Sequence, residues 1–105
     1  MYYTYVLRSE KDGNFYIGFT RDLKQRFELH NKGGVDSTKD RRPLKLIYYE
    51  ACIDREDATN REKHLKTHYG CMYLKKRFKS YFTGKFDFPI QGLNLYGTIF
   101  GARSI

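Results

Sequence analysis

The sequence holds 105 residues, which is enough for one domain with its own core and too few for a separate recognition module. Lysine and arginine number 20 against 12 acidic residues, and the formal net charge of +8 favours a polyanionic partner, although it could serve solubility alone. No apolar run is long enough to span a membrane, and the two cysteines fit neither a metal-ligand pattern nor a disulfide framework. The N-terminus enters a strand pattern without a leader, so we expect a cytoplasmic protein with reduced thiols.

Two short runs at the start of the chain predict a β-hairpin. Residues 2–8 and 14–20 are rich in aromatic and β-branched side chains with strand alternation. The Asp12-Gly13 pair between them favours a turn, because both residue types tolerate a positive φ. We therefore expect the hydroxyls of Tyr5 and Tyr16 to lie close together on adjacent strands.

Gly18 interrupts the second strand. Glycine inside a strand marks either a bulge or a place where another group approaches the backbone closely, and the sequence leaves both readings open. The strand ends at Thr20, which can cap the following helix.

That helix is expected from Arg21 to about Lys32, where two glycines follow and stop it. Leu23 and Phe27 form its buried stripe, while Arg26 and His30 lie one turn apart on an adjoining line. Two phenols, a guanidinium and an imidazole thus converge, which is more polar chemistry than a simple core requires.

Residues 31–42 predict a long polar loop with almost nothing to bury. Loops of this length in a compact domain are usually functional or disordered. Several side chains in it suit phosphate contacts, although ordinary solvated surface is the alternative. These side chains are Ser37, Thr38, Lys39, Arg41 and Arg42.

A third strand is expected over residues 44–50, followed by a helix that Asp54 caps and that Gly70 closes after about Tyr69. Glu62 falls on the apolar line of this helix, where a carboxylate is costly to bury without a cation or a metal. The alternative is an ordinary surface pair with Lys66, one turn further on. The other members of the line are Ala58, Leu65 and Tyr69.

A third helix, Cys71 to about Phe82, should turn Leu74, Phe78, Tyr81 and Phe82 inward. Its outward side would be a cationic patch that we expect to bind nucleic acid, formed by Lys75, Lys76, Arg77 and Lys79. Residues 84–105 are apolar and glycine-rich, and could be a strand pair, an arm onto a neighbouring chain or partly disordered. The predicted organisation is a domain over residues 1–83 and a tail over 84–105. Its class is α/β (α+β), with a three-stranded, mainly antiparallel sheet flanked by helices in the order β-β-α-β-α-α.

Together these motifs resemble the GIY-YIG nuclease superfamily over about residues 2–82. The closest likeness is to its small standalone members, which are also similar to the N-terminal nuclease domain of the DNA-cutting protein of excision repair. The strength of the resemblance lies in the spacing of the whole set rather than in any single triplet. The set is Tyr3-Thr4-Tyr5, Tyr16-Ile17-Gly18, Arg26, His30 and Glu62.

The resemblance implies a hydrolase of DNA phosphodiester bonds that uses a divalent metal, usually Mg²⁺, with Mn²⁺ as the substitute, and links to DNA repair. By position, Tyr5 and Tyr16 match the tyrosines of the two triplets, Arg26 and His30 match the helix pair, and Glu62 matches the metal-binding glutamate. The chain departs from the family in its first triplet, which begins Tyr-Thr instead of Gly-Ile. A late asparagine of several members also has no clear match here.

The residues agree with such chemistry. One carboxylate, Glu62, suits a single hydrated magnesium ion, and Arg26 can grip phosphate oxygens. Either Tyr5 or Tyr16 could accept the proton of the attacking water, and the sequence does not decide between them. We therefore expect a DNA endonuclease with low sequence specificity or a dependence on DNA structure, and a protein partner or a dimer could supply target recognition. The alternatives are a nucleic-acid-binding module without useful catalysis and a protein-interaction domain.

Overall fold

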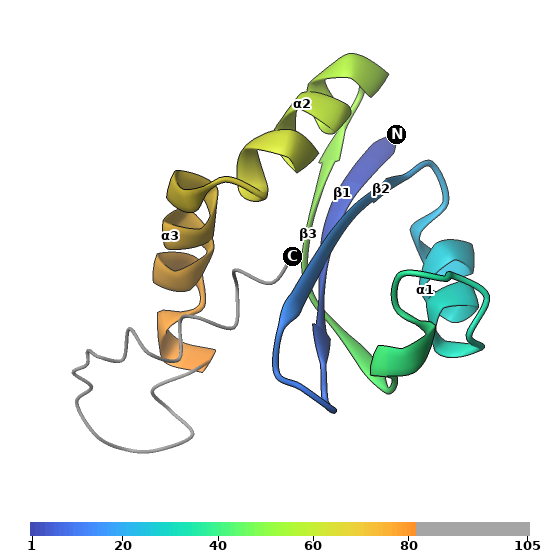
Figure 1. Cartoon of the computed structure of the whole chain (residues 1–105). Coiled ribbons are helices and arrows are strands. Elements are labelled where there is room, and N and C mark those ends of the chain that lie inside the picture. The colour runs from blue at the N-terminus through green and yellow to red at the C-terminus, as the bar shows by residue number, and fades with distance from the viewer. Residues whose placement is uncertain (82–105) are drawn as a thin grey trace.

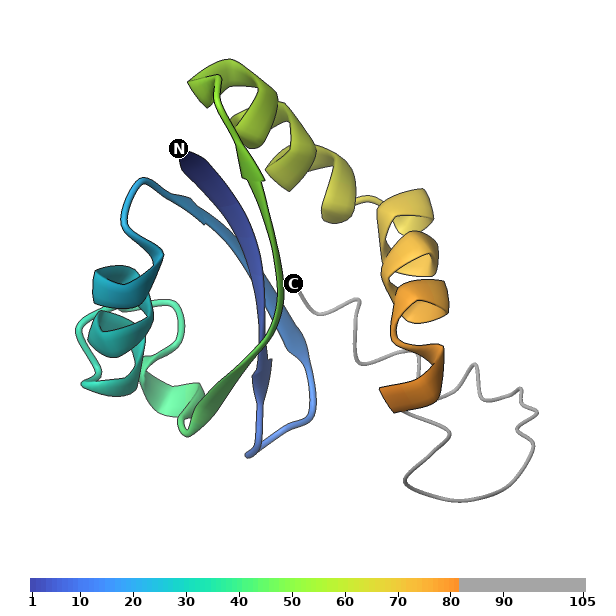
Figure 2. The same ribbon diagram turned by 180° about the vertical axis from the view of Figure 1, so that it is seen from behind.

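The computed structural model describes residues 1–81, so the expectations for Phe82 and for residues 84–105 lie outside the described residues. Three antiparallel strands form one sheet in the order β2-β1-β3. Helix α1 and the loop after it cover one face of the sheet, and α2 and α3 cover the other (Figures 1 and 2). The predicted class and element order are confirmed. The elements are β1 (Tyr2–Ser9), β2 (Phe15–Thr20), α1 (Leu23–Asn31), the 3₁₀ helix η1 (Lys39–Arg41), β3 (Leu44–Cys52), α2 (Arg55–Leu65) and α3 (His68–Arg77).

Strand alternation divides the core into two clusters, one on each face of the sheet. On the α1 face, Tyr5, Leu7 and Leu44 are buried against part-buried residues of α1, Leu23 and Phe27. The expected buried stripe of the first helix is therefore confirmed. The cluster on the α2/α3 face consists of Val6, Phe15, Ile17, Leu65, Cys71, Leu74 and Phe78.

The hairpin turn between β1 and β2 is longer than a two-residue turn. Gly13 has a φ of +75°, its amide donates to the Ser9 carbonyl at 2.8 Å, and the Ser9 amide donates to the Asn14 carbonyl at 2.9 Å. The Ser9 hydroxyl accepts from the amides of Lys11 and Asp12, both at 3.1 Å. The glycine therefore supplies the left-handed residue that the turn needs.

The cap of α1 differs from the sequence-based expectation. Asp22, not Thr20, is the N-cap residue, and its carboxylate accepts from the Gln25 amide at 3.0 Å. The Thr20 hydroxyl accepts from the Asp22 amide at 3.2 Å instead, and so orders the residue that does the capping. The helix starts two residues later than expected because aspartate at this position satisfies a first-turn amide.

The connection between α2 and α3 is a second correction. The chain leaves the helix at Lys66, and the Thr67 hydroxyl accepts from the Gly70 amide at 3.1 Å, which starts α3. Gly70 therefore lies inside α3 instead of closing α2, and a Cβ there would overlap the backbone of His64 and Leu65. Tyr69 is 74% exposed, so it does not belong to the buried line of the second helix.

The loop over residues 31–42 also buries more than its composition suggests. Val35 and Thr38 are both buried, and η1 forms part of the segment. The Leu44 amide donates to the side-chain oxygen of Asn31 at 3.1 Å, which ties the two ends of the loop together. The expectation of a loop with almost nothing to bury is therefore wrong.

The α2/α3 layer is anchored to the central strand by a buried hydrogen bond. The Thr4 hydroxyl donates to the Ala58 carbonyl at 2.7 Å, and neither residue is exposed. Leu74 and Phe78 point inward as predicted, with Tyr81 packed beside them. Over residues 1–81, no helix combines the length and apolar character that crossing a membrane would require.

Candidate active site

Four of the residues singled out in the sequence meet on the α1 face of the sheet. The Tyr5 hydroxyl lies 2.8 Å from Nε2 of His30, and Nε of Arg26 donates to the same hydroxyl at 3.4 Å. The Tyr16 ring lies beside both, with its centroid 6.4 Å from that of Tyr5 and 5.1 Å from that of His30. The two tyrosines are therefore neighbours, as the hairpin predicted.

Gly18 makes this arrangement possible. It pairs with Tyr5 across the β1–β2 ladder, and that ladder keeps one register from end to end, without a bulge. A Cβ at Gly18 would overlap the Cζ and hydroxyl oxygen of Tyr5, so the phenol lies flat over the glycine. Of the two readings that the sequence left open, close approach is the correct one.

His30 is buried completely and has a hydroxyl at each ring nitrogen. Tyr5 is at Nε2, and the Thr38 hydroxyl lies 2.8 Å from Nδ1. Thr38 itself has no exposed surface, and its hydroxyl can donate to the Val35 carbonyl at 3.5 Å. The sequence grouped Thr38 with the phosphate-binding side chains, whereas the structure places it in the core beside the histidine.

Burial sets the protonation states of this cluster. It raises the pKa of Tyr5 to about 12, with the charges of Tyr16 and Glu62 adding to it and the hydrogen bond from Arg26 opposing it. Burial, with the positive charge of Arg26 adding to it, lowers the pKa of His30 to about 4. At neutral pH the site therefore holds a protonated phenol beside a neutral imidazole.

Glu62 approaches the cluster from α2. It lies between the buried Ala58 and Leu65 along the helix, and its side chain is 21% exposed. Lys66 Nζ lies 3.0 Å from its Oε2, so the surface pair considered as the alternative is present. Glu62 is still close enough for its charge to raise the pKa of Tyr5.

The donor set at Glu62 is compatible with a hydrated magnesium ion. Within residues 1–81 no group of three or more His, Cys, Asp or Glu side chains gathers to hold a metal. Magnesium nevertheless keeps several waters and is commonly bound by one or two carboxylates together with substrate phosphates. A single part-exposed carboxylate fits that mode of binding and does not fit an all-protein cage.

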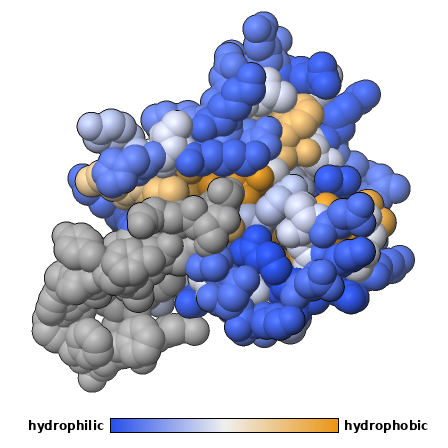
Figure 3. All heavy atoms as spheres, in the orientation of Figure 1, coloured by the Kyte–Doolittle hydropathy of each residue, from blue (hydrophilic) through white to orange (hydrophobic). Residues whose placement is uncertain are grey.

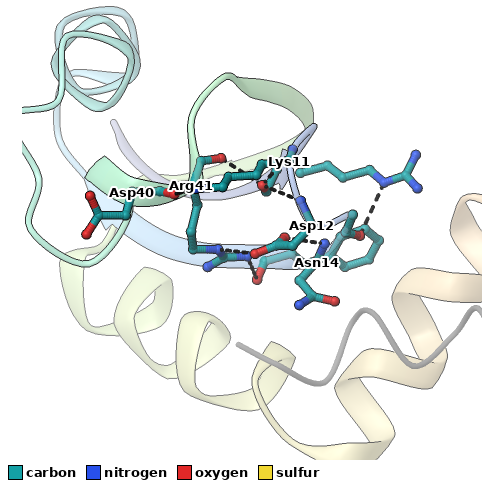
Figure 4. Close-up of polar contacts among 9 residues, drawn as sticks. Lys11, Asp12, Asn14, Asp40 and Arg41 are labelled. Carbon is teal, nitrogen blue, oxygen red and sulfur yellow. Dashed lines mark hydrogen bonds and ion pairs between the residues drawn. The ribbon is translucent and has the colours of Figure 1, made fainter.

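Arg41, expected to contact nucleic acid, is built into the hairpin turn (Figure 4). Its Nε donates to Asp12 at 3.1 Å, and its Nη2 donates to the Phe15 carbonyl at 3.3 Å. Its side chain is 20% exposed. Nearby, Lys11 Nζ donates to the Asp40 carbonyl at 3.0 Å, so the turn and η1 are joined twice. In this structure Arg41 fastens the loop to the sheet.

The other predicted cations fall into two groups on opposite layers. Lys39 and Arg42 are exposed in the loop on the α1 side, where Arg42 Nε donates to the Lys39 carbonyl at 2.8 Å. The second group belongs to the α3 side of the sheet (Figure 1). Hydrophilic residues cover much of the face seen in Figure 3. The second group consists of Lys75, Lys76, Arg77 and Lys79.

An ion pair that no sequence pattern indicated fixes α2 beside Glu62. Arg61 Nε lies 2.9 and 3.1 Å from the two carboxylate oxygens of Glu50 on β3, and its Nη2 lies 2.9 Å from one of them. The Tyr48 hydroxyl donates to the same carboxylate at 2.7 Å. Because the partners are far apart in the chain, no periodicity or spacing could have predicted the contact.

Comparison with known proteins agrees with this geometry. The family model of the GIY-YIG catalytic domain matches residues 1–73. A UPF0213 protein of Lacticaseibacillus paracasei is 47% identical over 66 residues, which cover 62% of this chain and 73% of the relative. For a UPF0213 protein of Streptococcus pneumoniae serotype 4 the identity is 43% over 65 residues, covering 61% of this chain and 65% of the relative.

A third relative, a UPF0213 protein of Staphylococcus saprophyticus, is 39% identical over 67 residues, covering 63% of this chain and 80% of the relative. No solved structure matches this chain significantly. Since the family model spans most of the described residues, and the four clustered side chains are those by which the sequence resembles the family, this chain belongs to the GIY-YIG family.

Proposed function

We propose that this protein is a divalent-metal-dependent DNA endonuclease that acts with low sequence specificity or with a preference for DNA structure. The observation that carries the proposal is the Tyr5 hydroxyl, held 2.8 Å from Nε2 of His30 and 3.4 Å from Nε of Arg26. A phenol between a neutral imidazole and a guanidinium can move a proton at the point where an anion is bound. Residues 1–83 would form the nuclease unit and residues 84–105 a tail.

Tyr5 is the phenol that we assign to the attacking water, because it alone of the two tyrosines has the hydrogen bond to His30. As the water gives a proton to the Tyr5 oxygen, Tyr5 gives its own proton to Nε2 of His30. The hydroxide attacks phosphorus, the bond from phosphorus to the leaving oxygen breaks, and solvent protonates that oxygen. This route avoids a free phenolate, which a pKa of about 12 disfavours at neutral pH.

Arg26 is the proposed phosphate ligand. Its Nε is engaged by Tyr5, which orients the guanidinium, and its terminal nitrogens suit the non-bridging oxygens of a phosphodiester. Glu62 would hold Mg²⁺ or Mn²⁺ together with waters and phosphate oxygens. When bound, such an ion neutralises the negative charge that builds up at the phosphate in the transition state.

The exposed Lys39 and Arg42, on the same layer as the cluster, would contact the DNA backbone beside the cut. The cationic residues at the end of α3 lie on the other layer, so they would form a separate contact. We propose the cytoplasm as the site of action and DNA repair as one process that such a nuclease could serve.

A second candidate is a DNA-binding module on the same fold without useful catalysis. The Lys66–Glu62 pair at 3.0 Å favours it, because Lys66 engages an oxygen that a metal ion would need. Binding without cleavage would still weaken steeply as salt rises, since the affinity comes from phosphate contacts.

Nicking of supercoiled plasmid and of branched DNA in Mg²⁺ or Mn²⁺ decides between the two. The wild type should cut, Glu62→Gln should not, and both should bind DNA equally in a salt-sensitive manner. Glu56→Gln, an exposed carboxylate on the first turn of the same helix, is the matched control and should cut like the wild type. Salt-sensitive binding with no cutting by the wild type would favour the binding module, and full activity of Glu62→Gln would refute the metal assignment.

A further inference from the structure

The imidazole of His30 lies in a fully buried position between two hydroxyl groups from distant parts of the chain. Tyr5 comes from the central strand, and Thr38 comes from the loop before η1. Arg26 and Tyr16 complete its surroundings, the first through its charge and the second through a ring edge. With two ring nitrogens and two hydroxyls in contact, the direction of every hydrogen bond follows from one choice of tautomer.

The number of available acceptors selects that tautomer. If Nε2 carried the proton, it would donate to the Tyr5 oxygen, which already receives Arg26. The phenol hydrogen, on a residue that is 1% exposed, would then have no acceptor among residues 1–81. If Nδ1 carries the proton, Nδ1 donates to Thr38, Thr38 donates to the Val35 carbonyl, and Tyr5 donates to Nε2. Only this second arrangement satisfies every buried donor.

We propose that Thr38 is a positioning residue: by accepting a hydrogen bond from Nδ1 of His30, its hydroxyl keeps Nε2 unprotonated and aimed at the Tyr5 hydroxyl. This inference rests on the proposed function, because it concerns the base that receives the proton of Tyr5. Thr38 touches neither water nor phosphate, and it acts only through the histidine.

The loop holds Thr38 firmly enough for that task. Its amide donates to the Val35 carbonyl at 3.1 Å, and its own carbonyl accepts from the Arg41 amide at 2.9 Å. Arg41 is in turn tied to the hairpin turn through Asp12 (Figure 4). When His30 accepts a proton at Nε2, its Nδ1 hydrogen keeps the same acceptor, so the ring need not turn during the reaction.

Nitrogen NMR of the imidazole rings in the full chain tests the arrangement directly. At pH 7.5 wild-type His30 should show a protonated Nδ1 and an unprotonated Nε2, with the exposed His64 and His68 as internal references. Thr38→Val, which keeps the shape and removes the hydroxyl, should raise the population of the other tautomer. Thr38→Ser should restore the wild-type spectrum, and Ser37→Ala, on the exposed neighbouring residue, should not change it.

Cleavage kinetics then test the functional half. Thr38→Val should lower kcat at least about tenfold with KM unchanged, a part of the roughly 10²–10⁴-fold that a positioned base contributes, and Thr38→Ser should recover it. Wild-type His30 protonated at Nε2, or an unaltered tautomer in a folded Thr38→Val, would overturn the inference. So would an altered tautomer without any loss of kcat. If the wild type cuts no DNA, the proposed function fails, while the wild-type tautomer still decides whether Thr38 orients His30.

Discussion

Replacing Gly18 by alanine is the sharpest test of how the site is built. The added methyl group would overlap the end of the Tyr5 ring, which lies flat on the glycine in an otherwise regular ladder. Tyr5 is 1% exposed and its hydroxyl is fixed by His30, so the ring has little room to retreat. Overpacking of this kind costs about 1–3 kcal/mol of the free energy of unfolding. Cleavage should fall as well, because a displaced phenol loses its contact with Nε2.

Urea denaturation measures the first effect. With a urea dependence of about 1–3 kcal/mol per molar for a small domain, the midpoint should drop by about 1 M. A double-mutant cycle with Tyr5→Leu, which removes the ring end, isolates the overlap. In that background Gly18→Ala should cost much less, with a coupling of at least about 1 kcal/mol. Additive losses in the two variants would refute the claim that Gly18 is there to admit the phenol.

Three further changes address other parts of the structure. Burial alone would raise the pKa of Glu50, but the hydrogen bond from Arg61 outweighs it and leaves the pKa lowered. Arg61→Gln should therefore cost about 1–2 kcal/mol in urea at neutral pH, and the difference should vanish as the pH falls through that lowered pKa, where the wild type loses the same contact. Because burial and a neighbouring arginine lower the pKa of His30 to about 4 from its usual value near 6.5, wild-type stability should fall by about 3 kcal/mol between about pH 6.5 and 4, and His30→Gln should flatten that slope. In plasmid nicking, Tyr5→Phe should lose more than about 10²-fold and Tyr16→Phe less, and the reverse order would contradict the assignment of the proton acceptor.

The sheet and its two faces could be predicted because they follow from local patterns. Alternation along residues 2–8 and 14–20 places Tyr5 and Tyr16 on the α1 face, and the one-turn spacing of Arg26 and His30 brings both to the same place. Such periodic signals need no knowledge of the rest of the chain.

The contacts that the sequence did not reveal depend on tertiary structure. Thr38 looked like one hydroxyl among several in a polar loop, and only the folded loop brings it to His30. Similarly, the Thr67 hydroxyl starts a new helix where Gly70 suggested an end, since a cap competes with a nearby glycine for control of the backbone. The pairing of Glu50 with Arg61 joins a strand to a helix, and neither residue type is unusual where it stands.

Three residues of this chain stand where their element would favour another type. Gly18 weakens a strand, His30 is an imidazole without exposed surface, and Glu62 is a carboxylate on an apolar line. Each is unfavourable locally, and each acts on the same group, Tyr5: Gly18 admits its ring, His30 binds its hydroxyl, and the charge of Glu62 raises its pKa. Exceptions scattered by chance would not share a single target. Their convergence is therefore independent support for placing the chemistry at the Tyr5 hydroxyl, because sequences that specify one fold tolerate local conflicts mainly where function needs them.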